Sequence, residues 1–177
     1  MNLFEMFPVE DEVCEARPLS YALLSECGRY RYTLSRTWSE EPSMAFVMLN
    51  PSTASADEDD ATIRRCIGFA KRDRAGGIAV VNLYAWRSTD PAGLKKSHDP
   101  IGPDNDKHIC SVLEGPGVGK VVVAWGANAT DSTRIDNVLK LIRLCGRKPL
   151  CFGKTKSGQP LHPLMLAYET PLVEFVK

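Results

Sequence analysis

The chain has 177 residues, a length that suits one domain with a core large enough to need no disulfide or metal to hold it. Its 22 basic and 22 acidic side chains cancel, which excludes a large overall positive field, so contact with nucleic acid would need a local basic patch. The six cysteines form no Cys-x-x-Cys pair, which disfavours a metal or iron–sulfur site. The acidic N-terminal stretch lacks the regions of a signal peptide, and no apolar run approaches the ~20 residues that cross a bilayer. We therefore expect a reduced, soluble, cytoplasmic protein without a metal or other cofactor.

The first predicted elements are a leader and a hairpin. Residues 1–18 are expected to form an irregular N-terminal leader, and residues 19–177 a single α/β domain. The domain begins with residues 21–38, which are typical of a β-hairpin because Tyr30 and Tyr32 alternate with other residues at the strand period.

Strands and helices then alternate along the chain. Four apolar runs predict strands at residues 44–50, 78–86, 120–126 and 149–153. Three segments with helical periodicity predict helices at residues 60–76, 104–113 and 131–145. Such alternation is typical of a parallel sheet between two layers of helices. We therefore predict a three-layer α/β/α fold with a mainly parallel, four-stranded central sheet, and the N-terminal hairpin is available to extend one edge.

One glycine-rich segment needs a separate interpretation. Residues 115–120 read Gly-Pro-Gly-Val-Gly-Lys, which superficially resembles a phosphate-binding P-loop. The spacing of that motif is missing, and the segment precedes a strand where a P-loop follows one. We therefore predict a turn there.

Polar and aromatic side chains cluster where the predicted parallel strands end. The ends carry Asn50, Asn82, Gly126 and Lys154, and His162 follows the last strand closely. In open α/β sheets, ligands bind outside the carboxyl ends of the strands. A buried amide without partners costs about 1–3 kcal/mol. The two asparagines must therefore be held by the backbone or meet a ligand at this edge.

The order of several short motifs resembles a known family. The motifs are NPSTA, DDATIRRC, NLYAWRSTDP, DPIGPDND, AWG and GQPLHPL. In this order they are similar to a family of bacterial and phage proteins known as domain of unknown function 1643, and the similarity spans about residues 20–168. That resemblance implies no activity.

A more distant resemblance is to the uracil-DNA glycosylase superfamily, especially its mismatch-specific branch. The stretch MLNPST resembles the Asn-Pro-Gly turn whose Asn positions the attacking water, with Ser52 where that family has Gly. VVNLYAWR resembles the strand whose Asn reads the flipped base, and VVVAWGANA resembles a third strand that ends in a Gly-containing turn. The closing His-Pro-Ser motif is matched by His162, with Leu164 in place of Ser. The resemblance implies a uracil-DNA-glycosylase-like fold.

The same resemblance implies a division of roles for cleavage of an N-glycosidic bond. Asn50 would orient water through its carbonyl, Asn82 would pair with a base edge, and His162 would bind the oxygen on which leaving-group charge develops. Asp60 or its neighbour Asp59 is a competing catalytic carboxylate. The residues expected at the substrate, several of them as stacking partners for the base, are Pro51, Ser52, Asn82, Tyr84, Trp86, Arg87, Trp125, Gly126 and Lys154. The target base would be flipped out of a duplex or single-stranded.

Each of these side chains also has a structural interpretation. Asn50 would cap its own turn, and Asn82 would be a satisfied core amide. His162 would lie at the surface or bond the backbone, and Asp60 would be a helix N-cap. The tryptophans would pack in the core, and the basic residues of the helix predicted at 60–76 would form a solvated face in place of a phosphate contact.

Three functions therefore remain open from the sequence. The first is a glycosylase-like hydrolase acting on a nucleobase in DNA or on a nucleotide. The second is a non-catalytic nucleobase- or nucleotide-binding module, such as an accessory to phage or bacterial DNA modification. The third is an interaction protein in which the polar strand ends are structural. The expected partner is a nucleobase, a nucleotide or DNA, and no membrane contact is expected.

Overall fold

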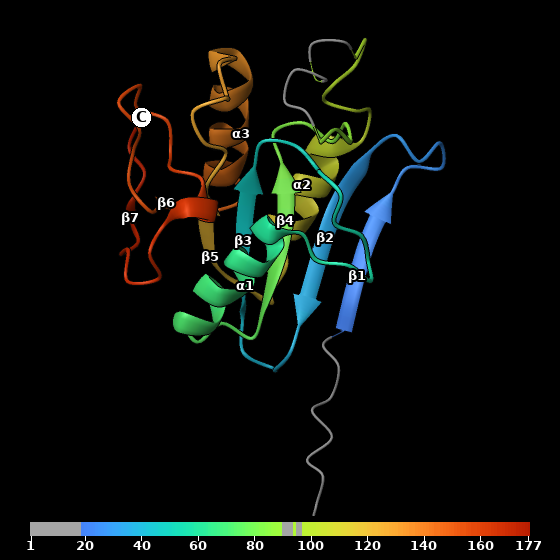
Figure 1. Cartoon of the computed structure of the whole chain (residues 1–177). Helices are drawn as coiled ribbons and strands as arrows, with labels where there is room; N and C mark the ends of the chain where they lie inside the picture. The colour runs from blue at the N-terminus through green and yellow to red at the C-terminus, as the bar shows by residue number, and fades with distance from the viewer. Residues whose placement is uncertain (1–18, 90–93, 95–96) are drawn as a thin grey trace, which may run out of the picture.

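A computed structural model of the protein describes residues 19–89, 94 and 97–177. The predicted leader, residues 1–18, lies outside the described residues. Within the described chain, one sheet has the strand order β1-β2-β4-β3-β5-β6-β7 (Figure 1). Its strands are β1 (Leu19–Leu24), β2 (Arg31–Thr37), β3 (Ser43–Met48), β4 (Gly77–Asn82), β5 (Val118–Val123), β6 (Pro149–Cys151) and β7 (Val173–Glu174).

The sheet is larger and more mixed than the sequence predicted. The four predicted parallel strands do run parallel, in the order β4-β3-β5-β6. The prediction of a four-stranded, mainly parallel sheet is nevertheless wrong, because β2 joins β4 antiparallel and β7 joins β6 antiparallel. The predicted hairpin extends one edge of the sheet through the pairing of β2 with β4, and the side chains of Tyr32 and Leu34 in β2 are buried. β7 has only two residues, both exposed, which is too short to give a strand period.

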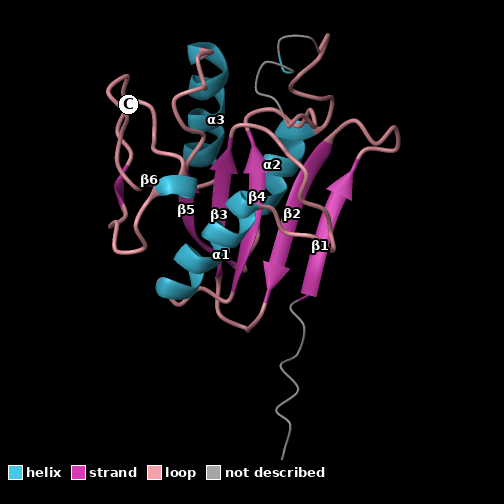
Figure 2. Cartoon of the chain, viewed as in Figure 1, coloured by secondary structure: helices cyan, strands magenta, loops and turns pink. Residues whose placement is uncertain are grey.

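Three α-helices of the described chain cover the two faces of the sheet (Figure 2). The helix α1 (Ala61–Arg72) lies on one face, where Ile63 and Phe69 join a core with Phe46 of β3. The helices α2 (Asn105–Glu114) and α3 (Ser132–Leu144) lie on the other face, where Ile109 and Leu139 join a second core. The arrangement is therefore the predicted three layers of helix, sheet and helix. None of these helices is long and apolar enough to cross a membrane.

The register of the central strands brings their carboxyl ends to one edge. Met48 of β3 pairs with Asn82 of β4, and Val47 pairs with Val123 of β5. The arrowheads of β3 and β4 point to this edge in Figure 1. The chain leaves it through three turns, after β3, β4 and β5, and these turns carry most of the residues that the sequence singled out.

Candidate functional site

A cavity of about 250 Å³ lies at this edge of the sheet. Its wall brings together residues from the ends of β3, β4 and β5, the start of α1 and the segment before the 3-10 helix η2 (Pro163–Met165). The predicted site residues on the wall are Asn50, Ser52, Asp60, Asn82, Trp125, Gly126 and His162. The volume lies just below the ~300–1,000 Å³ of pockets for drug-sized ligands, so the cavity suits a smaller ligand.

The carboxamide of Asn50 has a fixed orientation. Its Nδ2 donates to the carbonyl oxygens of Pro51 at 3.0 Å and Ser88 at 2.8 Å. These two bonds use both amide hydrogens, so the amide nitrogen must face the two carbonyls. The bonds hold the turn after β3, and they leave Oδ1 as the acceptor that Asn50 offers to a ligand or water.

The side-chain amide of Asn82 is buried at the cavity wall. Its side chain ends β4 at the cavity wall and is 2 % exposed. The backbone carbonyl of Asn82 accepts from Asn105 Nδ2 at 3.1 Å, but the side-chain amide of Asn82 bonds to none of the described residues. Because most buried polar side chains are hydrogen-bonded, an amide left open at a cavity wall points to a ligand.

His162 is held in one tautomer beside the end of β5. Its Nδ1 accepts from the backbone N–H of Leu164 at 3.2 Å, so Nε2 carries the proton in the neutral ring. Burial lowers the pKa of His162, and the nearby Asp60 carboxylate partly opposes this change. Gly126 permits the close approach, because its φ is +77° and a Cβ there would lie 3.1 Å from His162 Cβ. The cavity therefore receives a neutral imidazole whose Nε2–H can donate.

Asp60 combines a structural role with a place on the cavity wall. Its Oδ1 accepts from the backbone N–H of Ile63 at 2.8 Å and so caps α1. The other carboxylate oxygen has no hydrogen bond within the described residues. The competing carboxylate, Asp59, is turned away and pairs with Arg36 at 2.8 Å. Asp60 is thus the carboxylate that the cavity can use.

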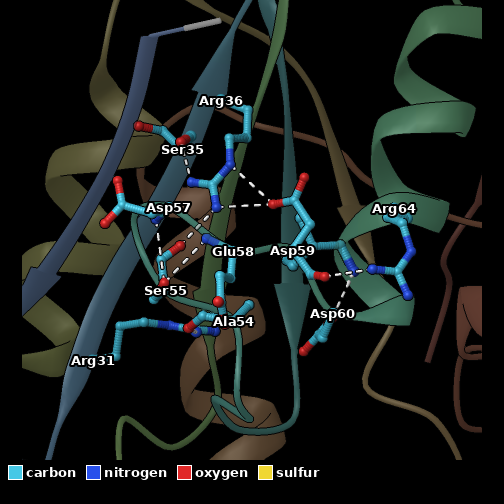
Figure 3. Close-up of polar contacts among 11 residues, drawn as sticks. Arg31, Ser35, Arg36, Ala54, Ser55, Asp57, Glu58, Asp59, Asp60 and Arg64 are labelled. Atoms are coloured by element: carbon cyan, nitrogen blue, oxygen red, sulfur yellow. Dashed lines mark hydrogen bonds and ion pairs between the residues drawn. The ribbon is translucent and has the colours of Figure 1, made fainter.

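Arg31 is on the cavity wall and was missed by the sequence analysis. It begins β2, is 3 % exposed and donates from Nη1 to the carbonyl oxygen of Ala54 (Figure 3). An arginine in an alternating strand is ordinarily exposed, so the strand pattern hid it. Nothing else in the sequence sets Arg31 apart from the other charged residues of the hairpin.

The loop between β3 and α1 is fixed by two arginines of β2, as Figure 3 shows. Besides Arg31, Arg36 donates from Nη2 to the carbonyl oxygen of Ser55 at 2.6 Å and pairs with Asp59. Ser55 Oγ accepts from the N–H groups of the two residues that precede Asp59, at 3.2 and 3.1 Å. This wall of the cavity is therefore braced by the neighbouring hairpin.

A comparison with protein-family models found one match, to the family described as a protein of unknown function (DUF1643), over residues 31–164. The chain belongs to the DUF1643 family. The matched region begins at Arg31 and includes every residue of the cavity wall. No curated protein and no solved structure matches the chain.

Other predicted site residues of this DUF1643 protein do not lie on the cavity wall. Trp86 meets Tyr30 of the hairpin edge-on, with ring centroids 5.6 Å apart. Arg87 donates to the carbonyl oxygen of Gly28 at 3.0 Å, and so also joins the hairpin. Lys154 donates to the carbonyl oxygen of Val176 near the C-terminus. These three side chains follow the strand ends in sequence but bind segments away from the cavity.

Two aromatic residues and a proline have structural contacts. Tyr84 lies beside α3 with its hydroxyl 3.4 Å from an Asp131 carboxylate oxygen, and burial, with a smaller effect of that carboxylate, raises the pKa of Tyr84 to about 12. Trp125 borders the cavity, but its ring is 1 % exposed and packs edge-on against Phe175 in the core. Pro51 is buried below the turn and supplies a carbonyl to Asn50.

The DUF1643 cavity is lined by hydrogen-bonding groups. Within the described part of the chain, no group of three or more His, Cys, Asp or Glu residues could hold a metal ion. The wall instead presents donors from Arg31 and His162, acceptors from Asn50 and Asp60, and both kinds from Asn82. Such a set suits a planar polar ligand with alternating donors and acceptors.

Proposed function

We propose that the cavity binds a nucleobase and that the protein is a hydrolase that cleaves the bond between a base and its sugar. The observation that carries this proposal is the open carboxamide of Asn82, which is almost fully buried on the wall of a small cavity. An amide offers one donor side and one acceptor side, which is the pairing that a base edge requires. The resemblance to the uracil-DNA glycosylase superfamily supports the same assignment.

The other wall residues supply the remaining parts of the reaction. Asn50 Oδ1 orients a water whose oxygen bonds to the anomeric carbon of the sugar, and the water's proton passes to Asp60. The electron pair of the broken C–N bond leaves with the base. His162 donates from Nε2 to the base oxygen on which the negative charge develops. The neutral ring already carries its proton on Nε2, because Nδ1 accepts from the Leu164 N–H, so it can make this bond.

The basic residues of α1 favour a nucleotide or a single accessible base over a long DNA duplex. Arg64 donates to the carbonyl oxygen of Asp59 at 2.5 Å, and Arg65 lies over the ring of Tyr168 at 3.8 Å. Arg72 pairs with the neighbouring Asp73 at 2.7 Å. These side chains already have partners, and duplex affinity comes mainly from cations that are free to neutralise phosphates.

The two departures from the glycosylase motifs also favour a substrate smaller than a DNA duplex. Ser52 brings a side chain to the cavity wall where a glycine would leave room. Leu164 is 39 % exposed and cannot donate the side-chain hydrogen bond of a serine. We therefore propose a substrate smaller than the duplex that the glycosylase superfamily is known for.

The second candidate is a nucleobase-binding module without catalysis. It is favoured by the structural bonds of the two residues proposed to handle water, since Asn50 holds its turn and Asp60 caps α1. Under this proposal the base is recognised by Asn82 and the cavity performs no hydrolysis.

A comparison of two buried asparagines tests the proposed function. Asn82→Ala removes no side-chain bond to any described residue, whereas Asn105→Ala, at a residue off the cavity wall, removes the side-chain bonds to the backbone carbonyls of Asn82 and Leu83. We expect Asn82→Ala to keep its melting temperature within about 2 °C and to lose base release by at least about 100-fold. Asn105→Ala should instead lower the melting temperature, because it removes the side-chain donor of the Asn82 carbonyl and one of the two side-chain donors of the Leu83 carbonyl.

The assay uses oligonucleotides with uracil, mismatches or modified pyrimidines, together with the corresponding free nucleotides. Released base is measured by chromatography, and alkali-labile sites by gel electrophoresis. Binding of free bases without release, lost in Asn82→Ala, would establish the binding module. Neither release nor binding with any of these substrates would show that the cavity does not take a nucleobase.

A further inference from the structure

Arg31 is a buried cation whose hydrogen bonds are incomplete. The only hydrogen bond of its guanidinium to the described residues runs from Nη1 to the carbonyl oxygen of Ala54. Nε is fully buried without a partner in that part of the chain, and Nη2 has none there either. No carboxylate of the described residues lies within 4.0 Å of the guanidinium. Because buried charges in proteins are nearly always paired, this side chain requires a negative partner.

The surroundings of Arg31 leave its charge without a contacting carboxylate among the described residues. Burial lowers the pKa of Arg31 to about 10, with Asp60 opposing the change and Arg87 and Arg36 adding to it, so the guanidinium is charged at neutral pH. Arg36 is neutralised by its ion pair with Asp59. Asp60 is the carboxylate on the cavity wall, but it does not form an ion pair with Arg31. The wall therefore presents a cation and an anion that are not in contact with each other.

We propose that Arg31 binds an anionic group of the ligand, a carboxylate or a phosphate, within this cavity. The inference rests on the proposed function, and it narrows the substrate to a nucleobase that carries an acidic group or to a nucleotide bound through its phosphate. The guanidinium has a second nitrogen free, so it can bond an oxygen of either group. The charged group lies at Arg31, because the Asp60 carboxylate repels it.

Arg36 provides a matched control for Arg31. Both are buried arginines of β2, and both bind carbonyls of the loop between β3 and α1. Arg36, however, has a carboxylate partner and does not line the cavity. Because an unpaired charge is costly to bury, an apolar side chain of similar length removes that cost, so Arg31→Met is expected to fold. Arg36→Met breaks an ion pair and is expected to be less stable.

The experiment measures the melting temperature while sodium acetate or sodium phosphate replaces sodium chloride at constant ionic strength. In the wild type, at least one of the two anions should give a saturable rise of about 2–4 °C, because a ligand that binds only the folded state stabilises it. Arg36→Met should keep this rise and Arg31→Met should lose it. The linear effect of salt on hydrophobic burial is common to all three proteins and is subtracted.

The two anions distinguish the source of the negative group. A response to acetate alone identifies a carboxylate on the base, a response to phosphate alone identifies a nucleotide phosphate, and a response to both establishes a general anion site. A second measurement on the wild type follows the NMR signal of Arg31 Nε–H, assigned with Arg31→Lys, which should shift saturably with the same anion. This measurement does not depend on the folding of Arg31→Met.

The proposal is overturned if neither anion gives a saturable rise, or if the rise persists in Arg31→Met. In that case Arg31 serves only to fix the loop through Ala54. The assay uses simple anions and a stability readout. A protein that releases no base can therefore still bind the anion, and a protein that releases base can fail to bind it, so the two proposals fail separately.

Discussion

Hydrogen bonds with backbone groups determine whether a side chain in the cavity offers a donor or an acceptor to a ligand. The amide hydrogens of Asn50 are occupied by two carbonyls, so its oxygen faces outward. The Nδ1 of His162 is occupied by the Leu164 N–H, so its Nε2–H is the free group. In both residues hydrogen bonds to backbone groups decide whether the side chain offers a donor or an acceptor. These two groups of the site come from segments outside the strands, whereas Asn82 and Arg31 lie at the ends of β4 and β2.

His162 should make the stability of the protein depend on pH. Burial lowers the pKa of His162 in the folded state, so below the ordinary value near 6.5 the unfolded chain binds the proton more readily. The stabilisation is therefore complete above about pH 6.5 and is lost as the pH falls toward the lowered pKa of the folded state. Protonation would also replace the Nδ1 acceptor by a donor facing the Leu164 N–H.

The measurement compares the free energy of unfolding in urea for the wild type and His162→Asn between pH 4 and pH 8. The asparagine oxygen can still accept from Leu164 but does not titrate. The wild type should lose more stability than the variant between neutral pH and pH 5. A stability difference that is constant over this range would contradict the neutral, buried imidazole.

For single residues, the sequence predicted which residues lie at the strand ends better than it predicted where their side chains point. Asn50 and Asn82 could be placed at one edge because the ends of parallel strands meet there. Tyr84, Trp86 and Arg87 follow the same strand ends but do not reach the cavity wall. Beyond Asn82 the chain leaves the sheet, so the alternation of side chains along a strand no longer determines where they point.

The start of α1 shows how one element supports both fold and site. Asp60 caps the helix through one carboxylate oxygen, and the same residue is part of the cavity wall. Its structural role and its proposed role as proton acceptor can be separated, because Asn caps a helix about as well as Asp but is a poor base. Asp131 caps α3 in the same way at 3.0 Å and does not line this cavity.

Asp60→Ala should therefore lower stability by about 1 kcal/mol through loss of the cap. Asp60→Asn should keep the melting temperature within about 2 °C but reduce base release by at least about 100-fold. Asp131→Asn is the control that changes a cap without changing the cavity. Wild-type rates of base release in Asp60→Asn would reduce Asp60 to a helix cap, and water activation would then have to come from another group.

Elements that the sequence predicted well are those whose packing is local. The segments that form α1 and α3 have an apolar stripe, and each begins with an aspartate that caps it. The contact between β2 and the loop after β3 is not local, since Arg31 and Ala54 are 23 residues apart. A strand pattern records that a face is buried but not which distant segment covers it, so this brace could not be inferred from the sequence.

At the scale of the whole molecule, the mixed sheet is a parallel core with antiparallel edges. The central strand β3 is buried on both faces, and from Met44 to Met48 no residue is more than 5 % exposed. Continuous apolar runs revealed such strands in the sequence. The edge strands β1 and β7 are largely exposed, and β7 gave no signal. Stability should therefore fall from the centre of the sheet to its edges.

Amide hydrogen exchange measured by NMR or mass spectrometry can follow this gradient. We expect the amides of β3 to exchange only through global unfolding, at least about 100-fold more slowly than those of β1 and β7, which open locally. Added urea should speed exchange in β3 with the full dependence of global unfolding, and should change exchange in the edge strands little. The cavity is built on β3, β4 and β5, so the most stable strands position its ligand-facing groups. Protection of β1 equal to that of β3 would contradict an open edge and would mean that a further chain covers it in solution.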